Sequence, residues 1–441
     1  MTEIDVAVIG AGAAGLAAAG ELWRRGLRVA VFEARDRIGG RIHTLRDERV
    51  QIPIELGAEF VHGEAPLTEG ILREAGLVDI DIAGDHWLAE RGHLRPYEGF
   101  WERVDHVLAQ ADPKGEDQSF DDFMARRPGG RPYAGARAAA REFVTGFHAA
   151  DPAQLSVLSI TPRDGEGPSE SASRSGRMVQ GYDRVPEWLA RDLGENLQLG
   201  RPVREIAWER GKVELTVGDD SSKVTARAAI VTVPIGVLQA PPDAPGGIRF
   251  LPDPPRLRRT LDLVAMGAVV RLVLGFREIP WKGRGDLDRM SFLHLGGDGA
   301  FRVCWTPYPL RAPVLVAWSG GPPAAELSRQ KPAEIEAAAL RTLAEHLGIS
   351  RQRLASRLEG IWSHDWQADP FSRGAYSYAR VGGSEAARDL ARPVEKALFF
   401  AGEATDEEGR TGTVEGAIAT GLRAARQVKA ALRYTPAPGG R

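Results

Sequence analysis

The clearest pattern of hydrophobic positions lies at the start of the chain, where a short apolar run leads into glycines and then into a helical stretch. Residues Asp5 to Ile9 alternate β-branched and small apolar side chains, as buried strands do. The sequence Gly10-Ala11-Gly12-Ala13-Ala14-Gly15 follows, and an alanine- and leucine-rich helix is expected from there to about Gly26. A second apolar run, Arg28 to Phe32, ends at Glu33. This order predicts a unit of strand, helix and strand of about thirty residues.

Later apolar segments predict further strands, separated by a region of different character. Between about Gly76 and Val179 the pattern changes to helical segments with scattered aromatic residues. Serine, glycine and arginine dominate Ser169 to Gly181, which is expected to be a loop. The expected strands are Val203 to Ile206, Val213 to Val217, Ala229 to Val233, Val269 to Phe276, Val314 to Trp318 and Ala397 to Phe400. Helices are expected at Pro332 to Leu347 and Gly412 to Ala430.

The order of these elements predicts an α/β fold with two interwoven domains. A chain of 441 residues is longer than one compact core usually supports. Strand signals return in the middle and at the end, so a Rossmann-like nucleotide-binding domain is expected at 1–78, 180–247 and 380–432. The segments 79–179 and 248–379 are expected to form an inserted α+β substrate domain, and 433–441 a flexible tail.

Composition and charge exclude several classes of protein. Hydrophobic residues make up 43% and charged residues 27%, which argues against extended disorder. A formal net charge of −3 gives no pull toward nucleic acid. The one cysteine, Cys304, allows neither an internal disulfide nor a CxxC metal or redox pair. Acidic residues precede the first apolar run, and no run approaches the roughly twenty apolar residues of a membrane span. We therefore expect a cytoplasmic protein without nucleic-acid, membrane or metal partners, and the sequence leaves its oligomeric state open.

The first glycine pattern predicts a nucleotide site. Gly10 allows a tight turn, Gly12 lets the backbone approach a pyrophosphate, and Gly15 lets the helix pack close to the strand. The exposed N–H groups at the start of the helix then hold the phosphates. Glu33, at the end of the next strand, is expected to accept hydrogen bonds from ribose hydroxyls. FAD and NAD both contain the adenosine diphosphate that this motif binds, so the motif alone does not decide which of the two cofactors is bound.

A second glycine turn follows directly, in the stretch Glu33-Ala34-Arg35-Asp36-Arg37-Ile38-Gly39-Gly40-Arg41. Guanidinium groups flank its glycines, and such groups suit a diphosphate that extends inward toward a large ring. This arrangement favours FAD over NAD. The alternative is a surface loop with ordinary arginines.

At this point the chain resembles the flavin-dependent amine oxidases, the family of monoamine oxidases, polyamine oxidases and histone lysine demethylases. Four ordered blocks carry the resemblance over nearly the whole chain: VAVIGAGAAGLAAA with FEARDRIGGR at the start, IELGAEFVHG at 54–63, VTVPIGVL at 231–238, and AGEATDEEGRTGTVEGAIATGLRAA at 401–425. The resemblance implies the amine oxidase fold, in which an FAD-binding domain of the p-hydroxybenzoate hydroxylase type holds the flavin ring at its interface with a second domain.

The resemblance also implies how several residues meet the cofactor. Gly57 and Ala58 are expected against the flavin ring, Val203 against the adenine, and Glu403 at the ribityl or diphosphate region. Val414 is expected to bring its backbone N–H toward the pyrimidine edge of the flavin. The motifs and the resemblance together imply cofactor contacts by Gly10, Gly12, Ala14, Gly15, Glu33, Ala34, Arg35, Gly40, Arg41, Leu56, Gly57, Ala58, Glu59, Val203, Pro234, Trp366, Gly402, Glu403, Thr413 and Val414.

The segment 366–377 is similar to the part of the family that supplies the substrate-facing aromatic wall. Trp366 belongs to this wall, and Tyr376 matches one side of the aromatic cage in front of the flavin, whereas Thr413 stands where monoamine oxidases carry a second tyrosine. Monoamine oxidases have a flavin-linking cysteine where this chain has Ala375, so FAD is expected to bind non-covalently. His62 lies where polyamine oxidases place a His or Glu at the substrate channel, and this favours the polyamine oxidase branch.

Two charged positions near the expected flavin carry further predictions. Arg271 stands where the family usually has a lysine that holds a water against flavin N5 and assists the reaction with oxygen. Arginine keeps the charge but is bulkier, planar and does not give up its proton, so altered oxygen reactivity is expected. The alternative is that Arg271 merely pairs with a carboxylate. Glu59, next to the flavin block, is expected to favour a cationic substrate.

The implied reaction is oxidation of a small-molecule amine by a flavoenzyme. A hydride passes from the carbon next to the amine nitrogen to flavin N5, water hydrolyses the resulting imine, and O2 reoxidises the flavin with formation of H2O2. One alternative is an FAD-dependent desaturase or isomerase of an apolar substrate, which would share the first forty residues. A second is a flavin-binding protein with little oxidase activity because of Arg271, and a third is an NAD dehydrogenase.

Overall fold

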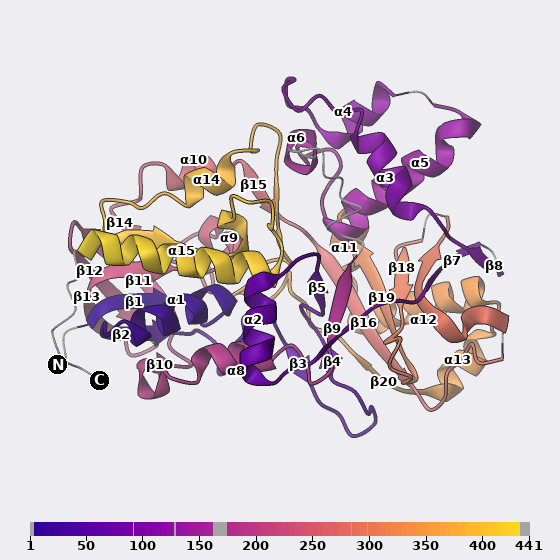
Figure 1. Cartoon of the computed structure of the whole chain (residues 1–441), viewed down its shortest axis with the longest axis horizontal. Helices are drawn as coiled ribbons and strands as arrows, with labels where there is room; N and C mark the ends of the chain where they lie inside the picture. The colour runs from indigo at the N-terminus through magenta and orange to yellow at the C-terminus, as the bar shows by residue number, and fades with distance from the viewer. Residues whose placement is uncertain are drawn as a thin grey trace.

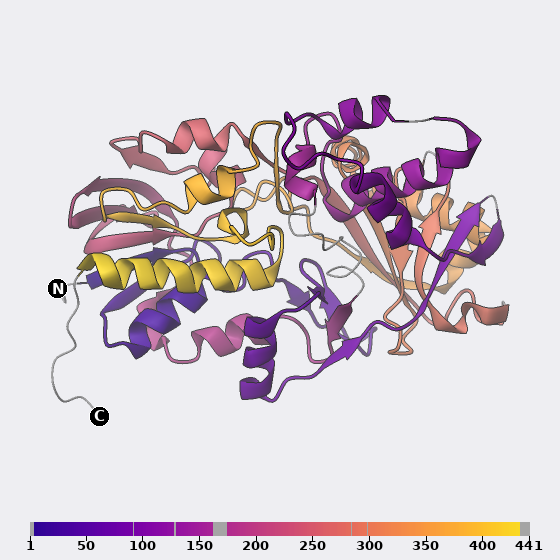
Figure 2. The same ribbon diagram turned by 45° about the horizontal axis from the view of Figure 1, so that its top comes forward.

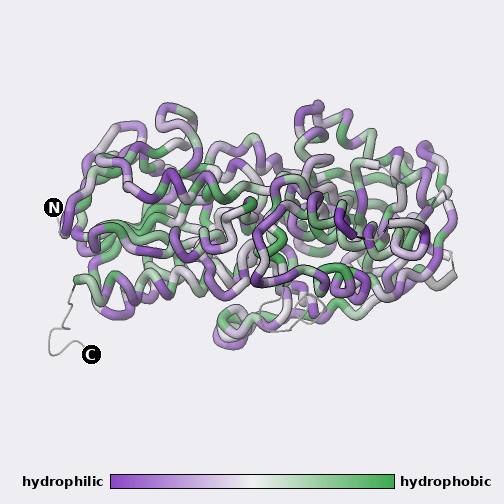
Figure 3. The backbone as a smooth tube through the Cα atoms, turned by 90° about the horizontal axis from the view of Figure 1, so that it is seen from above, coloured by the Kyte–Doolittle hydropathy of each residue, from purple (hydrophilic) through white to green (hydrophobic). Residues whose placement is uncertain are grey.

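The computed structural model describes residues 4–90, 92–127, 129–161, 174–283, 285–297 and 299–432. These residues form two lobes, each built around one large sheet (Figure 1). The first lobe combines early, middle and late segments of the chain, and the second consists mostly of the segments between them. Hydrophobic segments gather inside the lobes, whereas the outer turns are largely hydrophilic (Figure 3).

The first sheet has the strand order β10-β2-β1-β13-β12-β11-β14, and β22 also pairs with β13. Its central strands β2, β1, β13 and β22 run parallel. In β1, Val6 and Val8 face one hydrophobic core while Ala7 and Ile9 face another, which explains an apolar run buried on both sides. The strands are β1 (Ile4–Ile9), β2 (Val29–Phe32), β10 (Leu197–Gln198), β11 (Val203–Glu209), β12 (Lys212–Val217), β13 (Ser222–Val231), β14 (Arg249–Leu251) and β22 (Leu398–Phe400).

The helices α1 (Ala13–Arg24) and α15 (Val414–Leu432) lie side by side on this sheet (Figures 1 and 2). A methyl group on Gly421 of α15 would come within 2.2 Å of the Ala14 carbonyl oxygen, so the two backbones touch. The late part of the chain therefore returns to the opening glycine turn. The other short helices of this lobe are α2 (Pro66–Ala75), α8 (Arg184–Ala190), η2 (Gly194–Asn196), α9 (Ile235–Gln239), α10 (Leu257–Leu261), α14 (Ala386–Leu390) and η4 (Glu403–Thr405).

The second sheet has the strand order β20-β16-β19-β18-β17-β7-β8. Neighbouring strands are antiparallel except β17 and β7, which run parallel. The strands are β7 (Asp85–Glu90), β8 (His93–Pro96), β16 (Val269–Phe276), β17 (Met290–Leu295), β18 (Val303–Trp305), β19 (Val314–Gly320) and β20 (Leu358–Trp362). The helices α11 (Pro322–Leu327), α12 (Pro332–Leu347), α13 (Arg351–Arg357) and η3 (Gly285–Arg289) belong to the same lobe, and a shared core joins the first three to one sheet face.

A helical cluster with its own core covers part of this second lobe. It consists of α3 (Phe100–Leu108), α4 (Phe120–Ala125), α5 (Arg131–Glu142), the π-helix η1 (Phe143–Phe147) and α6 (Val157–Ile160). The π-helix continues directly from α5, and such wide turns are frequent at functional sites. Three small sheets lie elsewhere: β3 (Thr44–Leu45) with β4 (Ile54–Glu55), β5 (Phe60–His62) with β9 (Ser175–Met178) and β6 (Asp79–Asp81), and β15 (Val264–Met266) with β21 (Ser377–Ala379).

Most expected elements are confirmed, but two expectations on secondary structure were wrong. β7 and β8 lie in the region expected to be helical, because pairing with the distant β17 outweighs their weak local pattern. β9 lies inside the expected loop at 169–181, whose residues 169–173 fall outside the described ranges. β14 lies just beyond the expected domain boundary at 247 and pairs with β11 of the first sheet. The expected tail at 433–441 is also outside the described residues, and the domain division itself stays a prediction.

Among the described residues, no helix is both long enough and apolar enough to cross a bilayer.

Candidate active site

A cavity of about 1340 Å³ is lined by residues of both lobes. This volume exceeds that of a typical small-molecule pocket and leaves room for a large cofactor together with a substrate. Every residue predicted to bind the cofactor or the substrate lines this cavity, except Gly15. A methyl group on Gly15 would lie 1.9 Å from the Gly10 carbonyl oxygen, so Gly15 serves the close packing of helix on strand. The roles of the other residues stay predictions, but the fold brings them to one space.

The first glycine turn presents its backbone to the cavity. Gly10 has a φ of +103°, which favours glycine, and Gly12 precedes α1 without any side-chain cap. The first N–H groups of α1 are therefore left without the usual side-chain acceptor. Glu33 accepts hydrogen bonds from the backbone N–H groups of Ala11, at 2.7 Å, and Arg35, at 2.9 Å. Its carboxylate thus fixes the turn and stands at the cavity wall.

The second glycine turn abuts the first, which the sequence did not predict. The N–H of Gly39 donates to the carbonyl of Ala11 at 2.8 Å, and a methyl group on Gly40 would lie 3.3 Å from the Cα of Gly12. Arg37 donates to the carbonyl oxygens of Ile38, Gly40 and Ile42, so its guanidinium holds the turn together. The two turns form one continuous backbone surface.

Arg35 and Arg41 of this second turn pair with carboxylates, whereas we expected the arginines of the turn to be phosphate partners. Arg35 donates to both oxygens of Asp369 at 2.8 Å and to Ser372 Oγ at 2.9 Å. Burial alone would raise the pKa of Asp369, but hydrogen bonds from His364 and Arg35 hold it well below its usual range. The guanidinium of Arg35 is therefore already neutralised by a residue far away in the sequence. It still lines the cavity.

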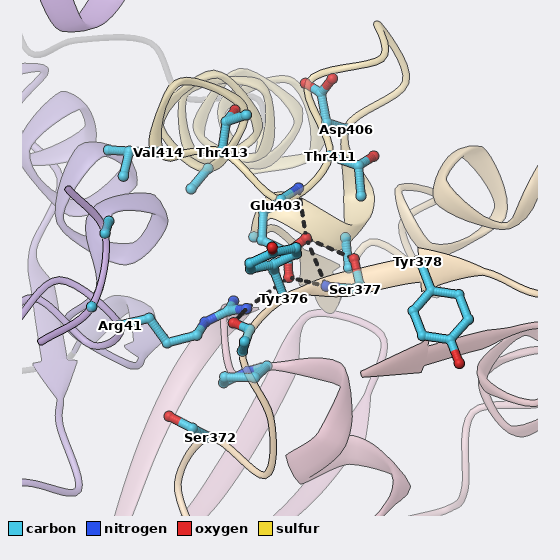
Figure 4. A pocket seen from close by; sticks show the side chains of 18 of the residues that line it. Arg41, Ser372, Tyr376, Ser377, Tyr378, Glu403, Asp406, Thr411, Thr413 and Val414 are labelled. Atoms are coloured by element: carbon cyan, nitrogen blue, oxygen red, sulfur yellow. Dashed lines mark hydrogen bonds and ion pairs between the residues drawn. The ribbon is translucent and has the colours of Figure 1, made fainter. Parts of the chain in front are cut away.

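Glu403 lies at the centre of a hydrogen-bond network in this wall (Figure 4). Its carboxylate accepts from Arg41 Nη1 at 2.8 Å, from Ser377 Oγ at 2.6 Å and from the N–H of Gly412 at 3.0 Å. Arg41 also donates to the carbonyl of Ala375 at 2.8 Å. The network joins the second glycine turn to the two late segments that carry Tyr376 and α15.

The wall around Gly57 is tightly packed. A methyl group on Gly57 would lie 1.9 Å from the carbonyl oxygen of Arg41 and 3.2 Å from the indole of Trp366. Trp366 is 4% exposed, donates through Nε1 to the carbonyl of Leu56 at 2.9 Å, and has the His364 ring at 4.1 Å. The N–H of Ala58 donates to the same Arg41 carbonyl at 3.1 Å. Only glycine fits at position 57 without a shift of the backbone.

Tyr376 and Thr413, the two expected sides of a cage, have different roles in the structure. Tyr376 donates to the carbonyl of Phe147 at 2.5 Å, and burial raises its pKa above the ordinary phenol value. Thr413 Oγ1 donates to the Arg410 carbonyl at 2.6 Å and accepts from the N–H of Gly416 at 2.9 Å. This is an N-cap of α15, so the Thr413 hydroxyl is engaged with backbone groups. Figure 4 shows Tyr376 and Thr413 in the same wall.

His62 is a partly buried, neutral residue. Burial lowers its pKa to about 4, and Nδ1 lies 3.1 Å from Ser175 Oγ. Its ring packs edge-on against Phe147 at 5.3 Å. His62 therefore presents an uncharged imidazole to the cavity near neutral pH.

Arg271 and Glu59 form the core of a buried charge network. Arg271 pairs with Glu59 and donates to the carbonyl of Gly57 at 2.9 Å. Glu59 also accepts from Arg177 Nε at 2.8 Å and from Trp305 Nε1 at 2.9 Å. Burial alone would raise the pKa of Glu59, but the two guanidinium groups lower it. The expectation that Glu59 favours a cationic substrate was wrong, because two cations already neutralise it.

The other residues predicted to contact the cofactor are Val203, Pro234, Gly402 and Val414. Val203 is buried in the core of the first sheet while it lines the cavity, and Pro234 precedes α9. Gly402 has a φ of +125° and donates through its N–H to Thr420 Oγ1 at 3.0 Å. Val414 begins α15, as expected.

An aromatic arm of the cavity lies in the second lobe, and the sequence analysis missed most of it. Its rings, which belong to several strands and helices, are those of Phe60, Phe100, Trp101, Phe147, Phe292, Trp305 and Trp318. The strand register places Phe292 beside Trp305 in neighbouring strands. The available signal was the single aromatic residues at alternating strand positions, but only the pairing of β17 with β18 shows that they share a face.

Known proteins resemble the whole chain. The family described as flavin containing amine oxidoreductase matches residues 13–429. Polyamine oxidase 3 of Oryza sativa subsp. japonica is 30% identical over 453 residues, which cover 96% of this chain and 88% of that protein. Polyamine oxidase 2 of Arabidopsis thaliana is 28% identical over 461 residues, with coverage of 96% and 88%. A solved structure of putrescine oxidase bound to putrescine has a TM-score of 0.80 at 22% identity and covers 97% of this chain and 99% of that one, which is a likeness of fold.

Proposed function

Because this chain belongs to the flavin-containing amine oxidoreductase family, we propose that it oxidises a small-molecule amine with FAD bound non-covalently. Membership makes the protein a flavin-dependent oxidoreductase acting on amines and does not favour the desaturase or NAD dehydrogenase alternatives. The observation that carries the finer proposal is one cavity with two glycine turns at one part of its wall and Tyr376 with an aromatic arm at another. Such a cavity suits a long dinucleotide whose ring meets an apolar substrate space.

The residues of the first lobe fit an extended FAD. The uncapped start of α1 and the backbone of the two abutting turns offer N–H groups to a diphosphate. Glu33 would accept from ribose hydroxyls while it keeps its bonds to the turn, because a carboxylate has four acceptor sites. Gly57 lines the cavity without a side chain, so its backbone would lie directly against a planar ring. Val414, the first residue of α15, would direct its backbone N–H toward that ring.

The position of the single cysteine supports the proposal of non-covalent binding. Ala375 stands in the cavity wall where a thioether would need a sulfur. Cys304 is fully buried in the core between the second sheet and its helices, and burial raises the pKa of its thiol. A buried, protonated thiol is a poor nucleophile. Neither position therefore offers a reactive thiolate for a thioether to the cofactor.

A bound flavin supplies the two-electron acceptor for the reaction. The carbon next to the amine nitrogen gives up a hydride, the nitrogen lone pair forms the C=N bond of an imine, and water hydrolyses the imine. O2 takes up the two electrons with two protons and leaves as H2O2. Free alkylamines have a pKa of about 10 and are mostly protonated near neutral pH, and an ammonium has no lone pair to give. The aromatic arm and the neutral His62 disfavour the charged form of the amine that enters the reaction and so assist its deprotonation.

Arg271 is expected to make the reaction with oxygen slow. Its guanidinium is held by Glu59 and by the Gly57 carbonyl, so it is rigid where the family usually has a lysine. Its Nε is buried and has no hydrogen-bond partner among the described residues. A fixed, permanently protonated group can orient a water but cannot exchange a proton with it.

The proposal is tested by purifying the protein and following its colour. We expect FAD to co-purify, to be released intact by acid denaturation, and to lose its visible absorbance under anaerobic conditions with at least one amine. The screen covers diamines, polyamines, aromatic amines and amino acids. A colourless protein that ignores added FAD, or a flavin that no amine reduces, would reject the proposal.

Tyr376→Ala is the matched test of the aromatic wall. It removes the ring and the bond to Phe147 but leaves the Glu403 network intact, so FAD should remain bound. We expect the anaerobic reduction rate with the best amine to fall by about tenfold or more, since the substrate is no longer oriented. Tyr376→Phe, which keeps the ring, should lose much less. A normal reduction rate in Tyr376→Ala would show that this ring does not orient the substrate.

A further inference from the structure

A buried carboxylate without a cationic partner lies in the first turn of α15. Glu415 is 5% exposed and directly follows Val414. Its Oε1 accepts from the N–H of Leu67 at 3.0 Å, and its Oε2 accepts from the N–H of Thr68 at 2.8 Å and from the Thr68 hydroxyl at 2.7 Å. Both oxygens act as acceptors, as those of an ionised carboxylate do. Among the described residues, Glu415 forms no ion pair.

Other carboxylates around the cavity differ from Glu415 in this respect. Three of those on the cavity wall have basic partners: Glu403 pairs with Arg41, Glu59 with Arg177 and Arg271, and Glu142 with His294, which is itself hydrogen-bonded to His86. Arg410 shortly precedes α15, but it pairs with Asp406 at 3.0 Å and with Glu408 at 2.8 Å. The charge of Glu415 is therefore balanced by hydrogen-bond donors alone.

These donors belong to the start of α2. Ala65, which precedes this helix, has no side chain that could cap it, and Pro66 is the first helical residue. Leu67 and Thr68 come next, so the Glu415 carboxylate replaces the missing cap from another helix. The N-terminus of a helix carries a positive charge of about half an elementary unit, so α2 offsets roughly half of the carboxylate charge. A negative remainder stays on Glu415.

The same turn of α15 borders the cavity. Thr413, Val414 and Ala417 line the cavity, whereas the side chain of Glu415 is directed to α2. Val414 and Glu415 are the first two residues of the helix, so their N–H groups have no acceptor inside it. The positive end of α15 and the negative charge of Glu415 therefore act on the same part of the cavity.

A charge of opposite sign lies at another part of the wall. Arg271 and Arg177 share the single carboxylate of Glu59, so this group keeps one net positive charge. Arg271 donates to the carbonyl of Gly57. In the proposed binding mode the flavin ring contacts both Gly57 and Val414. The ring would therefore experience the positive charge of the arginines and the negative charge of Glu415 together.

We propose that Glu415 lowers the reduction potential of the bound flavin and thereby offsets the effect of Arg271 and Arg177. This inference rests on the proposed function. A hydride carries two electrons and one proton, so its transfer leaves one additional negative charge on the acceptor. A nearby carboxylate opposes that charge and a nearby guanidinium favours it. Glu415 acts through its charge at the start of α15, without contact to the substrate, and makes the reduced cofactor a stronger electron donor.

The test measures the reduction potential of the holoenzyme by anaerobic titration against a redox dye, with the absorbance of flavin and dye recorded together. No amine turnover enters this measurement. Glu415→Gln keeps an oxygen that accepts from the start of α2 and removes the charge. At a fixed ratio of reduced to oxidised dye, we expect the ratio of reduced to oxidised flavin to rise by about tenfold, because the opposing charge is gone.

Thr68→Val is the matched control. It keeps the size of the side chain and the charge of Glu415 but removes one hydrogen bond to the carboxylate. The negative charge is then less well balanced, so the ratio of reduced to oxidised flavin should fall below the wild-type value. Loosened packing alone would move both variants in the same direction. An equal shift of the same sign in both variants, or the wild-type ratio in Glu415→Gln, would overturn the inference. If Glu415→Gln does not hold flavin, an unchanged or raised ratio in Thr68→Val overturns it.

Failure of the inference can be told apart from failure of the proposed function. If amines reduce the wild-type flavin but both variants keep the wild-type ratio, the amine oxidase function stands and the role of Glu415 is wrong. If the wild-type protein binds no flavin, the proposed function fails and the inference fails with it. If it binds a flavin that no amine reduces, only the proposed function fails, because the titration uses no amine.

Discussion

Glu59, beside the turn at Gly57, and Glu142, in the helical part of the second lobe, are two carboxylates on the wall of the same cavity, but their surroundings differ. Glu59 is 7% exposed and accepts from two guanidinium groups and an indole N–H. Glu142 is 21% exposed and, among the described residues, has a single imidazole as partner. The near end of the cavity thus has its charges satisfied within the protein, and the far end leaves one open.

This difference indicates a structural role for Glu59 and a possible ligand-binding role for Glu142. A buried carboxylate with all its acceptor sites engaged fixes the groups around it, and here it fixes Arg271 against the Gly57 carbonyl. A carboxylate with free acceptor capacity at a cavity wall can still bind a ligand. Burial alone would favour Glu59 over Glu142 as a functional residue. The hydrogen-bond partners favour Glu142 instead, because the acceptor sites of Glu59 are already occupied.

The largest expected effect comes from Glu59→Gln. Without its carboxylate, Arg271 and Arg177 stay buried close together with no anion, and the free energy of unfolding should fall by about 3–5 kcal/mol. Chemical denaturation followed by tryptophan fluorescence measures this. Glu142→Gln keeps an acceptor for His294 and should cost about 1 kcal/mol or less. If the two variants lost equal stability, the contrast between the two ends would not hold.

A smaller effect is expected for Gly57→Ala at the near end. The new methyl group would lie 1.9 Å from the Arg41 carbonyl oxygen, so the backbone must shift, at a cost of about 1–3 kcal/mol. The same shift should lower the amount of bound flavin, which the ratio of visible to ultraviolet absorbance reports. Gly70→Ala in α2 is the control, since a methyl group there has no atom within 4 Å. Full flavin content in Gly57→Ala would show that this surface does not hold the ring.

Arg271→Lys keeps a positive charge beside Glu59 but replaces the planar guanidinium with a flexible ammonium group. Lysine can still pair with Glu59 but cannot also reach the Gly57 carbonyl in the same geometry. We expect the reduced enzyme to react severalfold faster with oxygen, measured by stopped-flow absorbance after mixing with aerated buffer. An unchanged or slower oxygen reaction would contradict the role given to Arg271.

The smallest effect is expected for Thr413→Ala. It removes the N-cap of α15 and should lower the free energy of unfolding by about 1 kcal/mol, whereas Thr413→Ser keeps the hydroxyl and should lose little. Thermal unfolding of both variants measures the difference. A large loss of amine oxidation in Thr413→Ser, which keeps the cap, would instead show that the methyl group contacts the substrate.

Much of the near end could be predicted from the sequence because its signals are local. Gly10 with its positive φ, the apolar run of β1 and the small residues of α1 each report a conformation that neighbouring residues impose. Ordered motifs then identified the family. The same reasoning missed the ion-pair partners of Glu59 and Arg35, because each meets its partner only after folding: Asp369 is 334 positions from Arg35, and Arg271 is 212 positions from Glu59.

The far end could not be predicted from the sequence. His86, Glu142 and His294 belong to no motif, and His86 lies on a strand in the region expected to be helical. The register of β7 against β17 and the wide turn after α5 bring them together. The sequence by itself therefore determined the nucleotide fold, the family and the absence of a cysteine at Ala375, since these depend on residue type and local order. Only the tertiary structure decided which charges are neutralised and which remain free, because electrostatic partners are set by spatial distance, and strand register is not encoded in any single segment.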